Sequence, residues 1–202
     1  MFSLLESADS QRNTFAIQWP VGVCRGANRQ TSQCNIPRRN TWTIHGLWPS
    51  ETTTPSAVAF SANPLATIRA QLNALWPDVT RNNNPGFWSH EWGNHGVYYQ
   101  FNTNDHLLEY FTMNLNLING YPLFQILQRG GITPSNTNTY TLAQVNSAVS
   151  RAVGKNVNVR CANNNDELLQ EVRICFNAHY TATVNCGGRS NCNPNAIYYY
   201  AS

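Results

Sequence analysis

Three of the five histidines of this 202-residue chain lie in two short segments, 43–49 (TIHGLWP) and 87–96 (FWSHEWGNHG). Aromatic residues flank the histidines in both segments, and Glu91 lies between His90 and His95 in the second. Imidazole titrates near neutral pH and is the side chain used most often for proton transfer in catalysis. Together with His45 of the first segment, these residues predict an acid/base catalytic site.

The spacing within the second segment argues against a zinc protease. On a helix His90 and His95 would lie about 140° apart, whereas the histidine pair of such an enzyme is four residues apart and shares a face. Glu91 and His95 do have that spacing, so we expect the carboxylate to stabilise the charged imidazole of His95 and tune its pKa. The pattern therefore favours proton transfer.

Each of these histidines alone would more often be a hydrogen-bonded surface or core residue, but the cluster reverses that preference. Cleavage of RNA uses two histidines: one imidazole takes the proton of the 2′-hydroxyl, which attacks its own phosphorus, and the other protonates the departing 5′-oxygen. DNA lacks this nucleophile. Charge that develops on the non-bridging oxygens needs cationic or donor groups nearby, and His90 is a candidate.

The elements that position these segments follow from the hydrophobic pattern. Pro20 and a polar loop to Asn40 follow the first strand, and an Asn-Pro-Gly loop over 82–86 ends before the second histidine segment. Strands are expected over 14–19, 42–48, 169–176, 182–184 and 196–200. Helices are expected from Pro64 with Leu65, Ile68, Leu72 and Leu75 on one face, from His90, and over 107–118, 123–127 and 142–153, the last ended by Gly154.

This order gathers the helices in the middle of the chain and shows no internal repeat or linker. It predicts a single α+β domain over residues 1–202, with residues 1–11 as a flexible N-terminus. That N-terminus lacks the apolar core of a signal peptide, so we interpret the sequence as a mature form with an added start.

Charge and hydropathy limit the partners that are expected. The net charge of +3 comes from 12 arginines and a single lysine against 10 acidic residues, and only residues 38–39 form an arginine pair. High-affinity nucleic-acid binders instead concentrate basic residues along a face, so any RNA partner is expected to be bound transiently. No apolar run approaches the roughly 20 residues that span a bilayer, so no membrane partner is expected.

The six cysteines contain no C-x-x-C pair, so the usual zinc-ribbon spacing is missing and disulfides are favoured. Cys24 and Cys34 are expected to pair. Two further bridges are expected among the other four, with their connectivity left open: Cys161, Cys175, Cys186 and Cys192. Disulfides imply an oxidising compartment.

Both histidine segments resemble the two active-site segments of the T2 ribonucleases, most closely those of the plant S-like and self-incompatibility branch. The resemblance extends over nearly the whole chain, including FAIQWP at 15–20 and LWP at 75–77. It implies an antiparallel sheet flanked by helices and endonucleolytic cleavage of single-stranded RNA through a 2′,3′-cyclic phosphate. It also implies no metal or other cofactor, no DNA cleavage, and a secreted protein in an extracellular or vacuolar location.

The resemblance also assigns roles to individual residues. His45 would be the general acid, His95 the general base and His90 a phosphate-binding residue, while Glu91 would hold and polarise the site. Three further residues would bind substrate, with plain core packing as the alternative for the two aromatic ones: Gln18, Trp48 and Phe87.

Two departures from the family pattern bear on activity. Asn94 stands at a substrate-binding position where the family usually has lysine, and losing one group that stabilises developing charge commonly costs about 10² to 10³ in rate. After His95-Gly96 the family usually continues Thr-Cys, but Val97 and Tyr98 follow here, and residues 50–74 contain no partner cysteine. A bridge between the two active-site segments is therefore expected to be missing.

These departures leave two functions open. The first is an active but weakened ribonuclease. The second is a catalytically impaired, ribonuclease-like storage protein, for which the 28 asparagines of the chain would be a suitable nitrogen-rich composition. Polar loops alone would also explain the asparagines.

Overall fold

A computed structural model of the protein describes residues 12–37, 40–50 and 54–201, apart from the side chain of Asp166. The predicted flexible N-terminus, 1–11, lies outside the described residues. So do the arginine pair 38–39 and residues 51–53.

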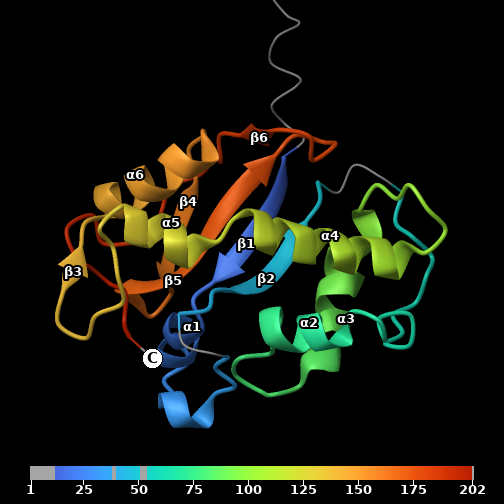
Figure 1. Ribbon diagram of the computed structural model, residues 1–202, viewed down its shortest axis with the longest axis horizontal. Helices are drawn as coiled ribbons and strands as arrows, with labels where there is room; N and C mark the ends of the chain where they lie inside the picture. The colour runs from blue at the N-terminus through green and yellow to red at the C-terminus, as the bar shows by residue number, and fades with distance from the viewer. Residues whose placement is uncertain (1–11, 38–39, 51–53, 202) are drawn as a thin grey trace, which may run out of the picture.

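The long strand β5 (Asn165–Phe176) is the centre of the sheet (Figure 1). It pairs antiparallel with β1 (Asn13–Gln18) on one side and with β4 (Asn158–Ala162) on the other. β1 in turn pairs antiparallel with β2 (Thr43–Trp48), which carries the first histidine segment. The predicted strands in β1, β2 and β5 are confirmed.

Three short strands complete the described sheet: β3 (Thr139–Tyr140), β6 (Thr183–Val184) and β7 (Ile197–Tyr198). β7 runs parallel to β5, with Leu168 opposite Tyr198, so the sheet is mixed rather than wholly antiparallel as predicted. The α+β class is confirmed. β4 is a strand that was not predicted, although its sequence NVRCA alternates polar Asn158 and Arg160 with apolar Val159 and Cys161.

Three of the described helices agree closely with the predicted periodicity. They are α4 (His106–Gly120), α5 (Leu123–Arg129) and α6 (Leu142–Val153). Thr141 and Gln144 form a capping box at the start of α6, and Gly154 ends it with φ of 77°. A left-handed residue after a helix is usually glycine, so the stop was visible in the sequence.

The helix that carries the second histidine segment begins earlier than predicted. α3 spans Asn84–Asn94, and the side chain of Asn83 accepts a hydrogen bond from the Gly86 N–H. The run Asn-Asn-Asn-Pro-Gly was interpreted as a loop, but asparagine is a favoured N-cap and proline a favoured first-turn residue. The prediction that the helix starts at His90 is wrong.

Two other helix predictions need correction. Pro20 opens a short helix, α1 (Pro20–Gly26), where a loop was predicted. A Cβ atom on Gly22 would lie 1.9 Å from the carbonyl oxygen of Leu169, so only glycine lets α1 pack this closely on β5. α2 (Arg69–Leu75) begins after a series of turns rather than at Pro64.

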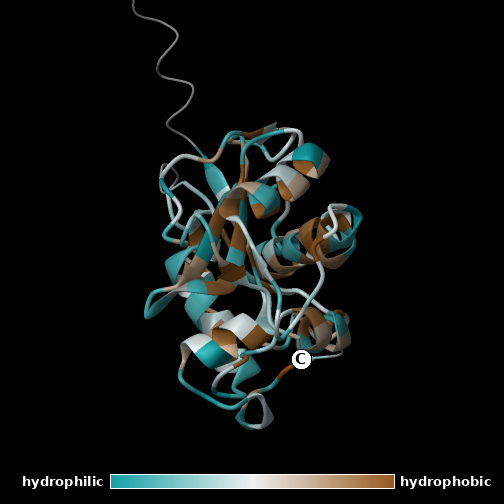
Figure 2. Cartoon of the chain, turned by 90° about the vertical axis from the view of Figure 1, so that its left-hand side faces the viewer, coloured by the Kyte–Doolittle hydropathy of each residue, from teal (hydrophilic) through white to brown (hydrophobic). Residues whose placement is uncertain are grey.

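The hydrophobic core lies between the sheet and the helices that cross it, as the brown segments of Figure 2 show. Phe111 of α4 packs against Trp76, with ring centroids 4.9 Å apart. Phe15 and Ile174, neighbours on β1 and β5, are fully buried on the same side. No helix among the described residues is long and apolar enough to cross a membrane.

All six cysteines are paired. The bridges are Cys24–Cys34, Cys161–Cys192 and Cys175–Cys186. The predicted N-terminal pair is confirmed, and the connectivity left open in the C-terminal group is settled. Cys161–Cys192 holds the chain after β6 against β4, and Cys175–Cys186 closes the end of β5.

Candidate active site

His45 lies in a β-bulge of β2. Residue 16 of β1 is opposite Gly46 and residue 17 is opposite Ile44, so His45 is the extra residue between them. A bulge changes the direction of a side chain and is frequent beside active sites. The His45 carbonyl oxygen accepts a hydrogen bond from the Trp76 indole at 2.8 Å, which holds the bulged backbone.

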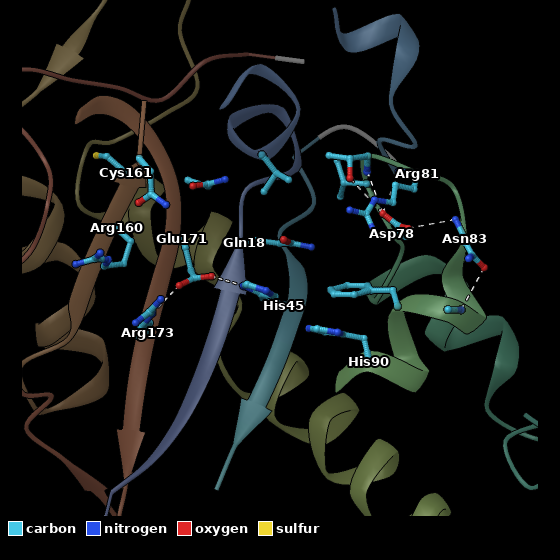
Figure 3. Close-up of a pocket in the computed structure, with 17 residues that line it drawn as sticks. Gln18, His45, Asp78, Arg81, Asn83, His90, Arg160, Cys161, Glu171 and Arg173 are labelled. Atoms are coloured by element: carbon cyan, nitrogen blue, oxygen red, sulfur yellow. Dashed lines mark hydrogen bonds and ion pairs between the residues drawn. The ribbon is translucent and has the colours of Figure 1, made fainter. Parts of the chain in front are cut away.

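The ring of His45 is bound by a carboxylate that the sequence analysis did not select. His45 Nδ1 is hydrogen bonded to Glu171 Oε2, and the Glu171 Oε1 accepts from Arg173 Nε at 2.6 Å. Glu171 and Arg173 are two residues apart on β5 and therefore lie on the same face of the sheet. Figure 3 shows the three side chains in a row, from β2 to β5.

The ion pairs of this row set the protonation of His45. Burial lowers the pKa of His45, but the hydrogen bond and charge of Glu171, together with the charge of Glu91, outweigh it and leave the pKa raised. Burial raises the pKa of Glu171, but His45 and Arg173 reverse the effect and leave it lowered. Both shifts favour a charged imidazolium beside a carboxylate.

Glu91 is almost completely buried and faces His45. Its Oε2 accepts a hydrogen bond from Trp48 Nε1 at 3.0 Å, and its Oε1 lies 4.0 Å from His45 Nε2. Burial raises the pKa of Glu91, although the nearby charge of His45 works in the opposite direction. A Cβ atom on Gly46 would lie 2.0 Å from Glu91 Oε2, which explains glycine after the histidine.

His95 follows the last turn of α3 as its C-cap, with φ of −134° and ψ of −51°. The prediction that Glu91 pairs with the His95 ring is wrong: the carboxylate binds Trp48 and His45 instead, and Glu91 is not among the groups that shift the pKa of His95. Burial and the nearby His90 and His45 lower the pKa of His95 to about 4. His95 is therefore neutral where His45 is charged.

The indole of Trp48 connects the two histidines. Its ring centroid lies 5.1 Å from that of His45 and 5.5 Å from that of His95. The guanidinium carbon of Arg173 lies 4.8 Å from the Trp48 ring centroid. One aromatic ring thus contacts two histidines and a guanidinium.

A cleft of about 740 Å³ opens beside this cluster, and Figure 3 shows its lining. Four of the predicted residues line it: Gln18, His45, Phe87 and His90. The Gln18 amide donates to the Ile44 carbonyl oxygen at 3.2 Å, and the Phe87 ring lies 6.0 Å from His45. The described residues contain no group of three or more metal-binding side chains.

Asn94 contacts His90 one helical turn before it. Its amide nitrogen donates to the His90 carbonyl oxygen at 2.8 Å and lies 3.1 Å from His90 Nδ1. Both side chains are exposed. Of the eight predicted site residues, five are in mutual contact: His45, Trp48, Phe87, Glu91 and His95. His90 and Asn94 contact each other, and Gln18 binds the Ile44 backbone.

The two active-site segments are joined by hydrogen bonds at the place where a disulfide was expected to be missing. The Ser56 N–H donates to the carbonyl oxygen of Val97 at 2.7 Å. The Trp92 indole donates to the carbonyl oxygen of Val58 at 2.9 Å. These bonds tie residues 56–58 to Trp92 of α3 and to Val97, just after that helix.

Glu171 and Arg173 are the site residues that sequence reasoning missed. The predicted strand over 169–176 includes both residues. Two opposite charges at alternate positions of a mostly apolar strand are the available signal, because they place both charges on one face.

Comparison with known proteins agrees with this geometry. Residues 11–186 match the Ribonuclease T2 family. Ribonuclease MC of Momordica charantia is 31% identical over 192 residues, covering 91% of this chain and 97% of that protein. Ribonuclease Oy of Magallana gigas is 32% identical over 183 residues, covering 83% of each.

A solved structure gives the same result for the fold. Ribonuclease MC1 from the seeds of bitter gourd superposes with a TM-score of 0.77 at 29% identity, covering 93% of this chain and 100% of that one. Since the family match and these relatives extend over most of the sequence, the chain belongs to the ribonuclease T2 family.

Proposed function

We propose that this protein is an endoribonuclease that cleaves single-stranded RNA through a 2′,3′-cyclic phosphate by metal-independent acid/base catalysis. One observation carries the proposal: two histidines contact the same indole, and the pKa of His95 is lowered while that of His45 is raised. Titratable groups whose environments push their pKa values apart are the mark of an acid and base pair.

In this mechanism neutral His95 takes the proton of the 2′-hydroxyl as that oxygen attacks phosphorus. The bond from phosphorus to the 5′-oxygen breaks, and the His45 imidazolium gives its proton to the leaving oxygen. Glu171 occupies Nδ1 of His45, which leaves Nε2 as the donating atom. Glu91 stabilises the charged ring from the other side.

The remaining predicted residues would hold the RNA. Bases would stack on Phe87 or Trp48, each worth about 1 to 3 kcal/mol, and Gln18 would contact a base edge. His90 would bind a phosphate, next to Asn94. Variants of ribonuclease MC1 have been solved in complex with 5′-GMP and 5′-UMP, which supports a nucleotide ligand for this cleft.

Two properties of the chain favour weak turnover. Asn94 carries no charge, and the two active-site segments are joined by hydrogen bonds rather than by a disulfide. The second candidate function is therefore a ribonuclease-like storage protein, to which the 28 asparagines are suited. Three disulfides support secretion to an extracellular or vacuolar location for either function.

Substrate class tests the reaction directly. The protein is expected to cleave single-stranded RNA in excess chelator and to leave the matching DNA intact, because the nucleophile is the 2′-hydroxyl of the substrate. Timed digestion of paired RNA and DNA oligonucleotides, with the cyclic phosphate identified by mass spectrometry, measures both. Chelator-sensitive cleavage, or equal attack on DNA, would overturn the mechanism.

The pH profile tests the role of Glu171. Glu171→Gln is expected to move the alkaline limb of kcat/KM to lower pH, because the carboxylate raises the pKa of His45 and the acid must be protonated. The acid limb, set by His95, stays in place. Glu167→Gln, the same change on the same strand, is the control. An unmoved alkaline limb would mean that His45 is not the acid.

A further inference from the structure

We propose that Arg173 is a catalytic cation of this enzyme: its guanidinium binds the non-bridging oxygens of the scissile phosphate and stabilises the charge that develops there. The inference rests on the proposed function, since it needs a phosphodiester between His45 and His95. It adds a residue on β5 to a site otherwise built on β2 and α3.

Arg173 is held so that part of its guanidinium remains available. Nε donates to Glu171 at 2.6 Å, and the planar group lies over Trp48, 4.8 Å from the ring centroid. Among the described residues, its two terminal nitrogens donate to none. The side chain is 33% exposed and lines the cleft together with His45. The guanidinium is therefore held through Nε, while its terminal nitrogens can donate to a ligand in the cleft.

The contacts of Trp48 indicate where the scissile phosphate lies relative to Arg173. A phosphodiester whose departing 5′-oxygen takes a proton from His45, and whose 2′-hydroxyl gives one to His95, must sit near the indole that contacts both rings. Arg173 stacks on that indole. A planar guanidinium can donate two parallel hydrogen bonds to phosphate oxygens, a geometry that lysine cannot provide.

The charge balance of the cluster requires a cation here. With both carboxylates ionised, Glu91 and Glu171 contribute two negative charges beside an anionic substrate. Protonated His45 and Arg173 cancel them, so without Arg173 the cluster would repel a phosphodiester. The neighbouring position on α3, Asn94, is neutral.

The other arginines of the cleft are placed differently. Arg81 and Arg160 also line it, but the Arg160 guanidinium donates to the carbonyl oxygen of Arg189 at 3.0 Å. Figure 3 shows Arg81 across the cleft from the row formed by His45, Glu171 and Arg173. Arg160 lies beside the row on β4, opposite Glu171 of β5 and on the side away from His45. They are suited to flanking phosphates, whereas Arg173 is suited to the reacting one.

Arg173→Gln is expected to lower kcat by about 10² to 10³, the usual cost of one group that stabilises developing charge, with a much smaller change in KM. Arg173→Lys should recover only part of the rate, because it keeps the charge and loses the two-pronged geometry. Arg151→Gln makes the same charge change at an exposed position of α6 and should leave kcat unchanged. Thermal unfolding of each variant checks that the fold is retained.

Two readouts separate this role from a structural one. Dinucleoside phosphorothioates with sulfur at either non-bridging position should be cleaved at unequal rates by the wild type, and Arg173→Gln should reduce that inequality. The charge of Arg173 also lowers the pKa of His45. If Arg173 acted only through the pKa of His45, Arg173→Gln would move the alkaline limb of the pH profile of kcat to higher pH and leave the plateau value of kcat unchanged.

The outcomes are distinguishable. A folded Arg173→Gln variant that keeps the wild-type kcat and thio effect overturns this inference and leaves the proposed function intact. A wild type without His45-dependent cleavage overturns both. A fall in kcat with loss of the thio effect supports the inference.

Discussion

Replacing either His45 or His95 with alanine is expected to lower RNA cleavage by about 10² to 10⁴, the usual contribution of a positioned proton-transfer group. Both roles must be filled in one step, so the double variant should cost about as much as the worse single one. Initial rates on a single-stranded RNA oligonucleotide measure the loss. His179→Ala, an exposed histidine outside the cleft, is the matched control.

The wild-type pH profile should be bell-shaped for the same reason. Activity is lost below the pKa of His95, lowered to about 4, because the base becomes protonated. It is lost again above the raised pKa of His45, because the acid loses its proton. The optimum therefore lies on the acid side of neutrality.

The outcome that contradicts this account is specific. If wild-type cleavage does not exceed that of either histidine variant, the residual activity does not come from this site. The storage function would then be favoured, because the fold and the disulfides do not depend on turnover.

The histidine site was predictable because most of it is local in sequence. His45 and Trp48 lie in one strand, and Phe87, His90 and Glu91 in one helix. Short motifs fix which side chains are close. They do not fix which partners those side chains choose, and Glu91 therefore binds His45 rather than His95.

Glu171 could not be paired with His45 from the sequence, since 126 residues separate them. The pairing depends on the strand order β2-β1-β5 and on the bulge that makes His45 an extra residue. Neither leaves a periodic signal in the sequence. Only the register of three strands places the carboxylate at Nδ1.

Secondary structure was predictable where periodicity extends over several turns. α4 and α6 were predictable because apolar residues repeat over 107–118 and 142–153. α1 has only seven residues, and packing on β5 through Gly22 stabilises it rather than its own pattern. Short elements of this kind depend on tertiary contacts.

Asn94→Lys is expected to raise the maximal rate. The residue ends α3, is exposed, and is followed directly by His95, so a lysine would add a cation beside the base. A single charge-stabilising group is commonly worth about 10² to 10³, which sets the upper bound of the gain. A cation near a helix C-terminus is also favourable for the helix, so the change should not destabilise the fold.

The gain should appear in kcat rather than in KM, because the added charge acts on the transition state more than on bound RNA. Asn94→Gln keeps a neutral amide and is the control. If the introduced lysine and Arg173 stabilise the same phosphate, their effects are coupled, and Asn94→Lys should raise kcat more in an Arg173→Gln background than in the wild type. Equal gains would indicate independent phosphates, and no gain in either background would contradict a charge deficit at this position of α3.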